Sequence, residues 1–272
     1  MPPIEIGKAP FELGTFAASL ATLFAKGVRY STIIDVGCAD GTFFLFYSYF
    51  GIFAGATPVN IEANPIYEES LRTIKDRAGG HFIVGAASDA DGEAEMILGA
   101  HPYWSSLRGR DDAYWKQIHN LNQGTCKVRT FTIDGMAEQL GLQPPFLLKL
   151  DVQGAEEQVL RGARRVLEDT DVVICEADMS DFQSLNSLMM EAEFDLFDLT
   201  HLHRIEDHML RWFYPVYLKR RLGSLKASTL WRSVHTDQII QMQAQRRTRS
   251  LQANAQILAE MSGRGSQQKL VP

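Results

Sequence analysis

Three carboxylates in the sequence stand where an apolar run, typical of a buried strand, gives way to a polar loop. Asp35 follows "STII", Glu62 ends "TPVNIE" and Asp151 ends "FLLKLD". Open sheets of α/β proteins bind ligands at the carboxyl ends of their strands. We therefore expect these three carboxylates to converge from separate segments on one ligand site.

The loop after the first run, "DVGCADG", limits the chemistry of that ligand. Gly37 and Gly41 permit a sharp turn and a close approach of the backbone to a ligand. A pyrophosphate usually needs the spacing G-x-G-x-x-G at a helix N-terminus, whereas this loop has G-x-x-x-G with Asp40 inside it. A carboxylate there would repel a pyrophosphate and would suit a cationic ligand.

Glu62 adds a second constraint, because a carboxylate at a strand end can accept both hydroxyl protons of a ribose. It stands 27 residues after Asp35, a separation similar to that of dinucleotide-binding sheets. Nicotinamide dinucleotides and S-adenosylmethionine both carry a ribose, and Asp40 favours S-adenosylmethionine. The alternatives are a dinucleotide, or a plain glycine turn in which Glu62 only caps the next helix.

Other residues near the strand ends complete the predicted cofactor site. Ser88 and Asp89, in "AASDADG", could bond an adenine amino group, although this segment is equally an ordinary turn. The predicted cofactor-binding residues are Asp35, Gly37, Cys38, Asp40, Gly41, Glu62, Ala63, Asn64, Ser88, Asp89 and Asp151.

Lys149 raises a separate question, since it lies in a run that indicates a central, buried strand. Strand residues alternate between faces, so Lys149 and Asp151 share one side. An unpaired buried ammonium is costly. We interpret Lys149 and Glu156 as structural, in a Lys–Asp or Lys–Glu pair that joins the strand to the next helix, and Asp151 as functional.

Strand and helix patterns alternate along the chain and predict an α/β fold with a mostly parallel sheet. The helix patterns cover residues 11–26, 42–51, 64–80, 154–169 and 181–192. Residues 92–98 and 126–133 alternate apolar and polar side chains, which predicts two strands. Residues 210–220 indicate a last strand, in which Pro215 favours an edge position or a bulge.

The long segment 99–125 is rich in aromatic residues, and long connections in compact domains are more often functional than idle. Its candidate substrate-binding residues are Tyr103, Trp104, Ser105 and Ser106, with a lid that packs on the core as the alternative. Asp151 is the candidate catalytic base, and His101 is its rival. Asp151, Glu176 and Asp178 end successive strands and could hold Mg²⁺, but we favour a site without metal.

Composition and charge narrow the setting. The chain is 45% hydrophobic and 22% charged, as soluble globular proteins are, and no apolar run is long enough to span a bilayer. Three widely spaced cysteines argue against a disulfide framework or zinc site and favour the reducing cytoplasm. Residues 219–272 carry ten Lys and Arg but only two carboxylates. We expect a helical extension that contacts an anionic partner or a second copy, without a firm signal for nucleic acid or membrane.

The segment "KLDVQGAE" resembles the signature of the FkbM-type methyltransferases, which use S-adenosylmethionine. Other segments resemble further motifs of that family in the same order: "IIDVGCADGTFF", "IEANP", "AASDADGEAEM", "SSL", "TFTIDGM" and "VVICEA". The resemblance covers roughly residues 31–218. Ala39 stands where the family usually has Asn, and Ala63 where it usually has Pro.

The resemblance implies a Rossmann-like class I methyltransferase fold, with a mostly parallel seven-stranded sheet and an antiparallel last strand. Residues 1–221 would form this domain, including the helix 11–26, and residues 222–272 would form the extension. The implied activity is O-methylation of a hydroxyl on a sugar or small natural product. The alternatives are a nicotinamide-dependent oxidoreductase and a non-catalytic binding protein of this fold. The substitution at Ala39 supports only the second of these alternatives.

Overall fold

The computed structural model describes residues 11–99, 101, 105–107, 124–204 and 209–227 of the chain. The chain divides into two units, residues 1–222 and 223–272. Among the described residues, the second unit contains α9 (Ser224–Ala227). The rest of the predicted helical extension lies outside the described residues, so its role stays a prediction. No helix among the described residues is long and apolar enough to cross a membrane.

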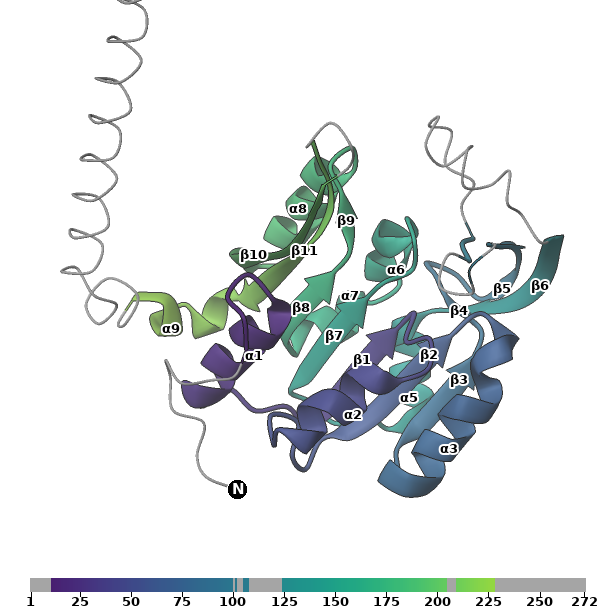
Figure 1. Ribbon diagram of the computed structural model, residues 1–272, viewed down its shortest axis with the longest axis horizontal. Coiled ribbons are helices and arrows are strands. Elements are labelled where there is room, and N and C mark those ends of the chain that lie inside the picture. The colour runs from purple at the N-terminus through teal and green to yellow at the C-terminus, as the bar shows by residue number, and fades with distance from the viewer. Residues whose placement is uncertain (1–10, 100, 102–104, 108–123, 205–208, 228–272) are drawn as a thin grey trace, which may run out of the picture. The chain divides into compact units, whose positions relative to one another are not determined.

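A mostly parallel sheet forms the centre of the first unit, as predicted (Figure 1). Its strands run in the order β10-β11-β8-β7-β1-β2-β3, and the short β9 pairs with β11. Strand β11 is antiparallel to both of its neighbours, β8 and β10. The strands are β1 (Thr32–Val36), β2 (Thr57–Glu62), β3 (His81–Val84), β7 (Phe146–Leu150), β8 (Thr170–Cys175), β9 (Ala177–Asp178), β10 (Phe194–Arg204) and β11 (Leu210–Lys219). This confirms the expected class I methyltransferase fold with its antiparallel last strand.

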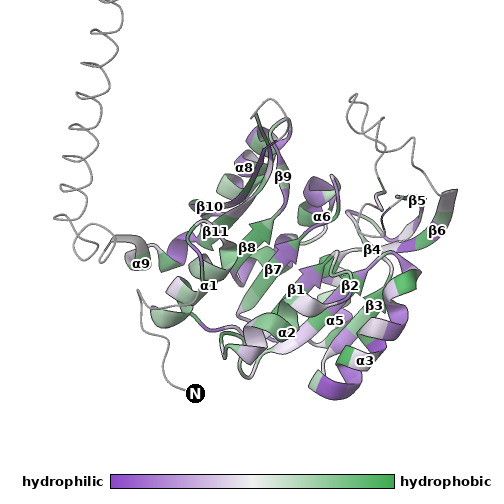
Figure 2. Cartoon of the chain, viewed as in Figure 1, coloured by the Kyte–Doolittle hydropathy of each residue, from purple (hydrophilic) through white to green (hydrophobic). Residues whose placement is uncertain are grey.

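Helices cover both faces of the sheet, so the central strands are buried along their whole length. Every residue of β1, β7 and β8 is buried. One face carries α1 (Phe16–Ala25), α2 (Thr42–Tyr49) and α3 (Glu68–Ala78), the last preceded by the 3₁₀ turn η1 (Pro65–Tyr67). The other carries α5 (Ile133–Leu140), α6 (Glu156–Arg161), α7 (Arg164–Glu168) and α8 (Phe182–Glu191). Figure 2 shows β8 at the centre of the sheet largely green and α3 at its outside largely purple, as this layering requires.

The two alternating runs pair with each other in a second, three-stranded sheet. Strand β5 (Gly92–Leu98) pairs antiparallel with β6 (Gly124–Phe131), and β4 (Ala86–Ala87) lies on the other side of β6. The second run ends sooner than predicted, because Thr132 accepts a hydrogen bond from the Gly135 N–H and caps α5 there.

The helix predicted over 154–169 is two short helices, α6 and α7, which break at Gly162. A Cβ at Gly162 would overlap the carbonyl oxygen of Ser88, so the loop after β4 packs against this break and requires a glycine there. The two helices nevertheless bury one continuous set of apolar residues: Ala155, Val159, Leu160, Ala163 and Leu167.

Pro215 does not mark an edge strand, because β11 lies inside the sheet between β8 and β10, but the alternative of a bulge agrees with the register shift of β10 between Leu196 and Asp198, opposite Tyr217 and Val216. Strand β11 pairs with β9 through Phe213 and with β8 only from Val216 onward. Tyr214 and Pro215 therefore face the gap where β8 gives way to β9. Pro215 pairs with Leu199 of β10 only, and a proline, which has no N–H, is tolerated where one side of the strand has no ladder partner.

Candidate functional site

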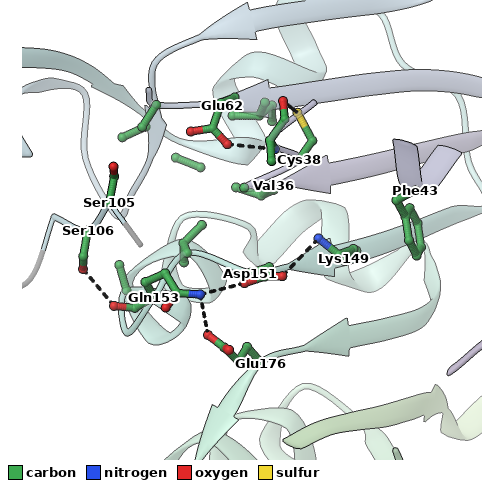
Figure 3. A pocket seen from close by; sticks show the side chains of 18 of the residues that line it. Val36, Cys38, Phe43, Glu62, Ser105, Ser106, Lys149, Asp151, Gln153 and Glu176 are labelled. Atoms are coloured by element: carbon green, nitrogen blue, oxygen red, sulfur yellow. Dashed lines mark hydrogen bonds and ion pairs between the residues drawn. The ribbon is translucent and has the colours of Figure 1, made fainter. Parts of the chain in front are cut away.

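A cavity of about 670 Å³ opens at the carboxyl ends of β1, β2, β7 and β8. Ligand pockets of roughly 300–1,000 Å³ are typical of small-molecule and cofactor sites. Figure 3 shows Glu62 on one side of it and the group of Asp151, Gln153 and Glu176 on the other. The predicted site residues that line it are Gly37, Cys38, Asp40, Glu62, Ala63, Ser105, Ser106, Asp151, Glu176 and Asp178.

The loop between β1 and α2 forms one rim of the cavity, and its glycines are required by close contacts. Gly37 has φ 72°, and a Cβ there would overlap the Asp151 carbonyl oxygen. Gly41 has φ 75°, and its Cβ would lie 2.6 Å from the Ile74 Cδ1. Gly41 therefore shapes the start of α2 but, contrary to the sequence prediction, does not line the cavity.

Glu62 is held rigidly at the end of β2. Its Oε2 accepts the Ala39 N–H at 2.9 Å, and its Oε1 accepts the Asn64 N–H at 2.7 Å. A carboxylate can accept about four hydrogen bonds, so both oxygens keep capacity for two ligand hydroxyls. Burial raises the pKa of Glu62, against the opposing effect of these two N–H donors. The arrangement suits a ribose diol.

Ala39 has an unusual backbone that this contact explains. Its φ of 48° lies in the left-handed region, which costs a non-glycine residue about 1–2 kcal/mol. That conformation accompanies the hydrogen bond from its N–H to Glu62. The loop therefore holds an unfavourable backbone conformation at Ala39, in which the Ala39 N–H fixes the carboxylate that faces the cavity.

Lys149 pairs with Asp35 across two neighbouring strands. The two residues are register partners in β7 and β1, and the Lys149 Nζ lies 3.0 Å from the Asp35 Oδ1 and 3.6 Å from the Asp151 Oδ2. Burial by itself lowers the pKa of Lys149, but the two carboxylates outweigh it and hold that pKa above its ordinary value. The ammonium therefore stays charged inside the sheet.

This pair corrects two sequence predictions. Lys149 joins strand to strand rather than strand to helix, because its register partner is a carboxylate. Asp35, predicted to bind the cofactor, is fully buried and does not line the cavity. Glu156, interpreted as structural, accepts the N–H groups of Val152 and Gly154 and closes the turn after β7.

Asp151 is surrounded by donors. Tyr214 donates its hydroxyl hydrogen to Oδ2 at 3.0 Å, and the Gln153 side-chain amide donates to Oδ1 at 3.1 Å. The same side-chain nitrogen donates to Glu176 at 3.0 Å. The backbone carbonyl oxygen of Gln153 accepts the Ser106 hydroxyl hydrogen at 2.8 Å (Figure 3). Ionised carboxylates only accept hydrogen bonds, so Asp151 and Glu176 together orient the side-chain amide of Gln153 with its NH₂ group toward them.

Sequence reasoning missed Gln153, Tyr214 and an aromatic wall. The wall comes from α1, α2, β10 and β11. Its members that line the cavity are Phe16, Phe43, Phe46, Tyr47, His203, Trp212 and Tyr214. The rings of His203 and Trp212 are stacked with centroids 5.3 Å apart, and Phe16 packs edge-on against Tyr214 at 5.6 Å. The sequence signals for this wall were the aromatic runs "TFFLFYSYF" and "LRWFYPVYL".

Several predicted site residues lie elsewhere. Asn64 accepts the Ile66 N–H and caps η1, and Ser88 bonds its neighbour Asp89 in an exposed turn. Asn64, Ser88 and Asp89 do not line the cavity themselves, and the exposed His101 does not line it either. The other candidate substrate residues, Tyr103 and Trp104, fall outside the described residues.

The carboxylates considered for magnesium have other partners. Glu176 accepts from Gln153, and Asp178 pairs with Arg211 at 2.9 Å. Within the described part of the chain, no group of three His, Cys, Asp or Glu side chains is arranged to hold a metal ion. The set Asp151, Glu176 and Asp178 is therefore not assembled as a ligand cluster.

A family model described as the methyltransferase FkbM domain matches residues 35–210. The chain belongs to the FkbM methyltransferase family. The matched range contains both sides of the cavity up to the start of β11, including Glu62, Asp151 and Glu176. No curated protein matches the chain.

Three solved structures illustrate how distant its structural relatives are. The methyltransferase FkbM from Methylobacillus flagellatus KT is 16% identical, with a TM-score of 0.43 over 70% of this chain and 45% of its own. This chain thus spans less than half of that structure. A precorrin-6y C5,15-methyltransferase from Geobacter metallireducens GS-15 is 11% identical, with a TM-score of 0.39 over 75% of this chain and 87% of its own. An O-methyltransferase from neocarzinostatin biosynthesis was solved with S-adenosylmethionine and 2-hydroxy-5-methyl naphthoic acid. It is 10% identical, with a TM-score of 0.32 over 70% of this chain and 49% of its own.

Proposed function

We propose that this FkbM methyltransferase domain binds S-adenosylmethionine in the cavity and transfers its methyl group to a hydroxyl oxygen of a small-molecule acceptor. The observation that carries the proposal is Glu62, whose carboxylate is fixed by the N–H groups of Ala39 and Asn64 at a strand end. Membership of a methyltransferase family favours this activity over a nicotinamide-dependent oxidoreductase.

The residues of the cavity suit this cofactor chemically. Glu62 would accept the ribose hydroxyls, and the cavity side of Cys38 and Ala63 would pack beside the nucleoside. Asp40 and Asp151 give the lining the negative charge that a sulfonium nucleoside requires. S-Adenosylmethionine, when bound, supplies an electrophilic methyl group.

Asp151 is the proposed proton acceptor for the hydroxyl that is methylated. An alcohol becomes a competent nucleophile only as it loses its proton, and a positioned carboxylate assists this loss. Tyr214 and Gln153 hold one oxygen each of Asp151, so the side chain cannot swing away from the acceptor. Positioning of this kind supplies much of the rate in a displacement reaction.

An asparagine substitution tests this role. Asp151→Asn keeps the size of the side chain but cannot take a proton, so we expect turnover with labelled S-adenosylmethionine to fall by about 100-fold or more. Affinity for S-adenosylhomocysteine, measured by calorimetry, should stay within about threefold of the wild type. Full activity of this variant would remove Asp151 from the mechanism.

The matched control is Glu93→Gln, which changes an exposed carboxylate of β5 whose side chain is 74% exposed. This variant should behave like the wild type in both measurements. If the wild type bound S-adenosylhomocysteine but methylated no compound from broad acceptor pools, the non-catalytic binding protein would replace the enzyme as the proposal.

A further inference from the structure

We propose that Ser105 and Ser106 are positioning residues that couple the two sides of the cavity, so that cofactor binding at Glu62 orders the loop that carries Asp151. The inference rests on the proposed function and adds a regulation of the same site. Both serines line the cavity, and Figure 3 shows them between Glu62 and Gln153. The observation that carries the inference is a pair of hydrogen bonds, which these adjacent residues make to opposite sides of one cavity.

Ser105 is joined to the cofactor side of the cavity. Its hydroxyl oxygen accepts a hydrogen bond from the side-chain amide of Asn64 at 3.3 Å. The Asn64 Oδ1 accepts the Ile66 N–H, which orients the NH₂ group of that amide toward Ser105. The backbone N–H of the same Asn64 donates to Glu62 at 2.7 Å. One residue therefore connects Ser105 to the carboxylate that is proposed to bind the ribose.

Ser106 is joined to the side of the cavity that carries Asp151. Its hydroxyl donates to the backbone carbonyl oxygen of Gln153 at 2.8 Å, and the Gln153 side-chain amide donates in turn to Asp151 at 3.1 Å. Gln153 has a φ of 56°, which is unfavourable for a residue with a side chain, so its backbone needs contacts that hold it. The buried hydroxyl of Ser106 is such a contact. Ser106 therefore positions Asp151 through Gln153.

The second sheet anchors the two serines as one unit. Ser106 forms an isolated antiparallel bridge with Ile97 of β5, with N···O distances of 2.9 and 3.1 Å. The next residue, Leu107, packs against the apolar cluster that contains Met96, and Ala63 packs against the same cluster. Ala63 directly follows Glu62, so this cluster adds an apolar link between the serine segment and the cofactor side.

The hydrogen bonds form one path between the two sides of the cavity. The path runs through Glu62, Asn64, Ser105, Ser106, Gln153 and Asp151. A ligand bound to Glu62 would restrict the motion of the residues at its start. Ordering of one element lowers the entropy cost of ordering the next, so two sites can be coupled without a change of fold. An acceptor that enters after the cofactor would then find the proposed base already oriented.

The test follows the loop after β7 by hydrogen exchange, because this measurement needs no acceptor. The backbone N–H groups of Val152 and Gly154 donate to Glu156, so their exchange rates report how often the loop opens. The rates are measured by NMR on the full chain, with and without saturating S-adenosylhomocysteine. In the wild type we expect this ligand to slow the exchange of both amides by about tenfold.

Two variants cut the path at different points. Ser106→Ala should bind S-adenosylhomocysteine within about threefold of the wild type, yet keep less than about a third of the slowing. In turnover of labelled S-adenosylmethionine with acceptor pools, its kcat should fall about tenfold while its KM for S-adenosylmethionine changes by less than about threefold. Ser105→Ala should also remove most of the slowing, so it decides the question if Ser106→Ala fails to fold.

The matched control is Thr170→Val, which also removes a buried hydroxyl. The Thr170 hydroxyl donates to the backbone carbonyl oxygen of Val166 at 2.7 Å, as the Ser106 hydroxyl does to that of Gln153. Thr170 begins β8, at the end of the strand opposite the cavity. This variant should lose stability and keep the full slowing, which separates a positioning role from a purely structural one.

The outcomes separate this inference from the proposed function. Failure of S-adenosylhomocysteine to bind the wild type would contradict the proposed function, and the inference with it. Binding without any slowing at Val152 and Gly154 would overturn the inference alone. Slowing that survives in full in both serine variants would also overturn it, because the ligand would then order the loop by another route. An equal loss of slowing in Thr170→Val would do the same, since any loss of stability would then suffice.

Discussion

Tyr214 donates its hydroxyl hydrogen to the Asp151 carboxylate across 3.0 Å, although the two residues are 63 positions apart in the chain. Tyr214 lines the cavity from β11, where it pairs with Thr200 of β10 and lies between the segments of β11 that pair with β9 and with β8. Burial raises the pKa of Tyr214, and the charges of Asp151 and Glu176 raise it further. The phenol therefore stays protonated and remains a donor over the whole working pH range.

The first prediction concerns this donor. Tyr214→Phe removes the hydroxyl and keeps the ring, so Asp151 loses one of the groups that orient it. We expect kcat to fall by about tenfold while the dissociation constant of S-adenosylhomocysteine changes less than twofold. Steady-state kinetics measures kcat, and calorimetry measures the dissociation constant of S-adenosylhomocysteine. The control Tyr49→Phe alters an exposed tyrosine of α2 and should change neither; an unaffected kcat in Tyr214→Phe would show that this contact does not position Asp151.

The second prediction concerns the buried pair of Lys149 and Asp35. Lys149→Met leaves the Asp35 carboxylate buried without its cation, so we expect the free energy of unfolding in urea to fall by about 3–5 kcal/mol. Adding Asp35→Asn to this variant removes the uncompensated charge and should restore part of the loss. If the single variant lost less than about 1 kcal/mol, the pair would not hold the two strands together as inferred.

A third prediction separates backbone strain from steric overlap at the cofactor loop. Gly37→Ala and Gly51→Ala both place a side chain at positive φ, 72° and 76°. Only at Gly37 does the new Cβ overlap another atom, the Asp151 carbonyl oxygen, whereas at Gly51 it meets nothing within 4 Å. We expect Gly51→Ala to cost about 1–2 kcal/mol of unfolding free energy and Gly37→Ala clearly more, with loss of cofactor binding. Equal losses would show that the loop does not press against β7.

The fourth prediction is a pH dependence of cofactor binding. The pKa of Glu62 is raised by burial, so it takes up its proton at a higher pH than an exposed glutamate, and the protonated form accepts the ribose hydroxyls less well. Affinity for S-adenosylhomocysteine should therefore fall as the pH is lowered from 7 to 5. Glu62→Gln should bind more weakly at pH 7 and show little change with pH.

The raised pKa of Glu62 affects the free energy of unfolding in the opposite direction to the affinity for S-adenosylhomocysteine. A carboxyl with a raised pKa in the folded state contributes stability below its unfolded pKa, and this contribution is lost as the pH rises through the folded value. Glu62 itself thus does not destabilise the fold when the pH is lowered.

The variant Glu62→Gln also controls the binding measurement. If Glu62→Gln lost as much affinity for S-adenosylhomocysteine at pH 5 as the wild type does, the titrating group would be a residue other than Glu62.

The sequence predicted the parts of the site that depend on local signals. Apolar runs that end at Glu62 and Asp151 locate the ends of their strands, and parallel strands bring such ends to one edge of the sheet. The glycines of the first loop indicated a sharp turn and a close approach to a ligand; both adopt positive φ in the turn, and the close approach of Gly37 is to the Asp151 carbonyl oxygen. These features need only the periodicity of the chain and the rule that ligands bind at strand ends.

The rest depended on pairing between distant segments. Asp35 faces Lys149 because of the register of β1 and β7, which a single strand does not specify. Gln153 can bridge two carboxylates because its backbone adopts a φ of 56°, which nothing in "DVQGAE" predicts for a glutamine. Ser88 and Asp89 leave the cavity because β4 turns into the second sheet.

The most direct test of the account is a calorimetric titration of S-adenosylhomocysteine into the wild type and into Glu62→Ala. We predict one binding site per chain in the wild type and affinity at least tenfold weaker in the variant, because Glu62 accepts the ribose hydroxyls. No binding to the wild type, or equal binding to both proteins, would contradict the assignment of this cavity to the sulfonium nucleoside.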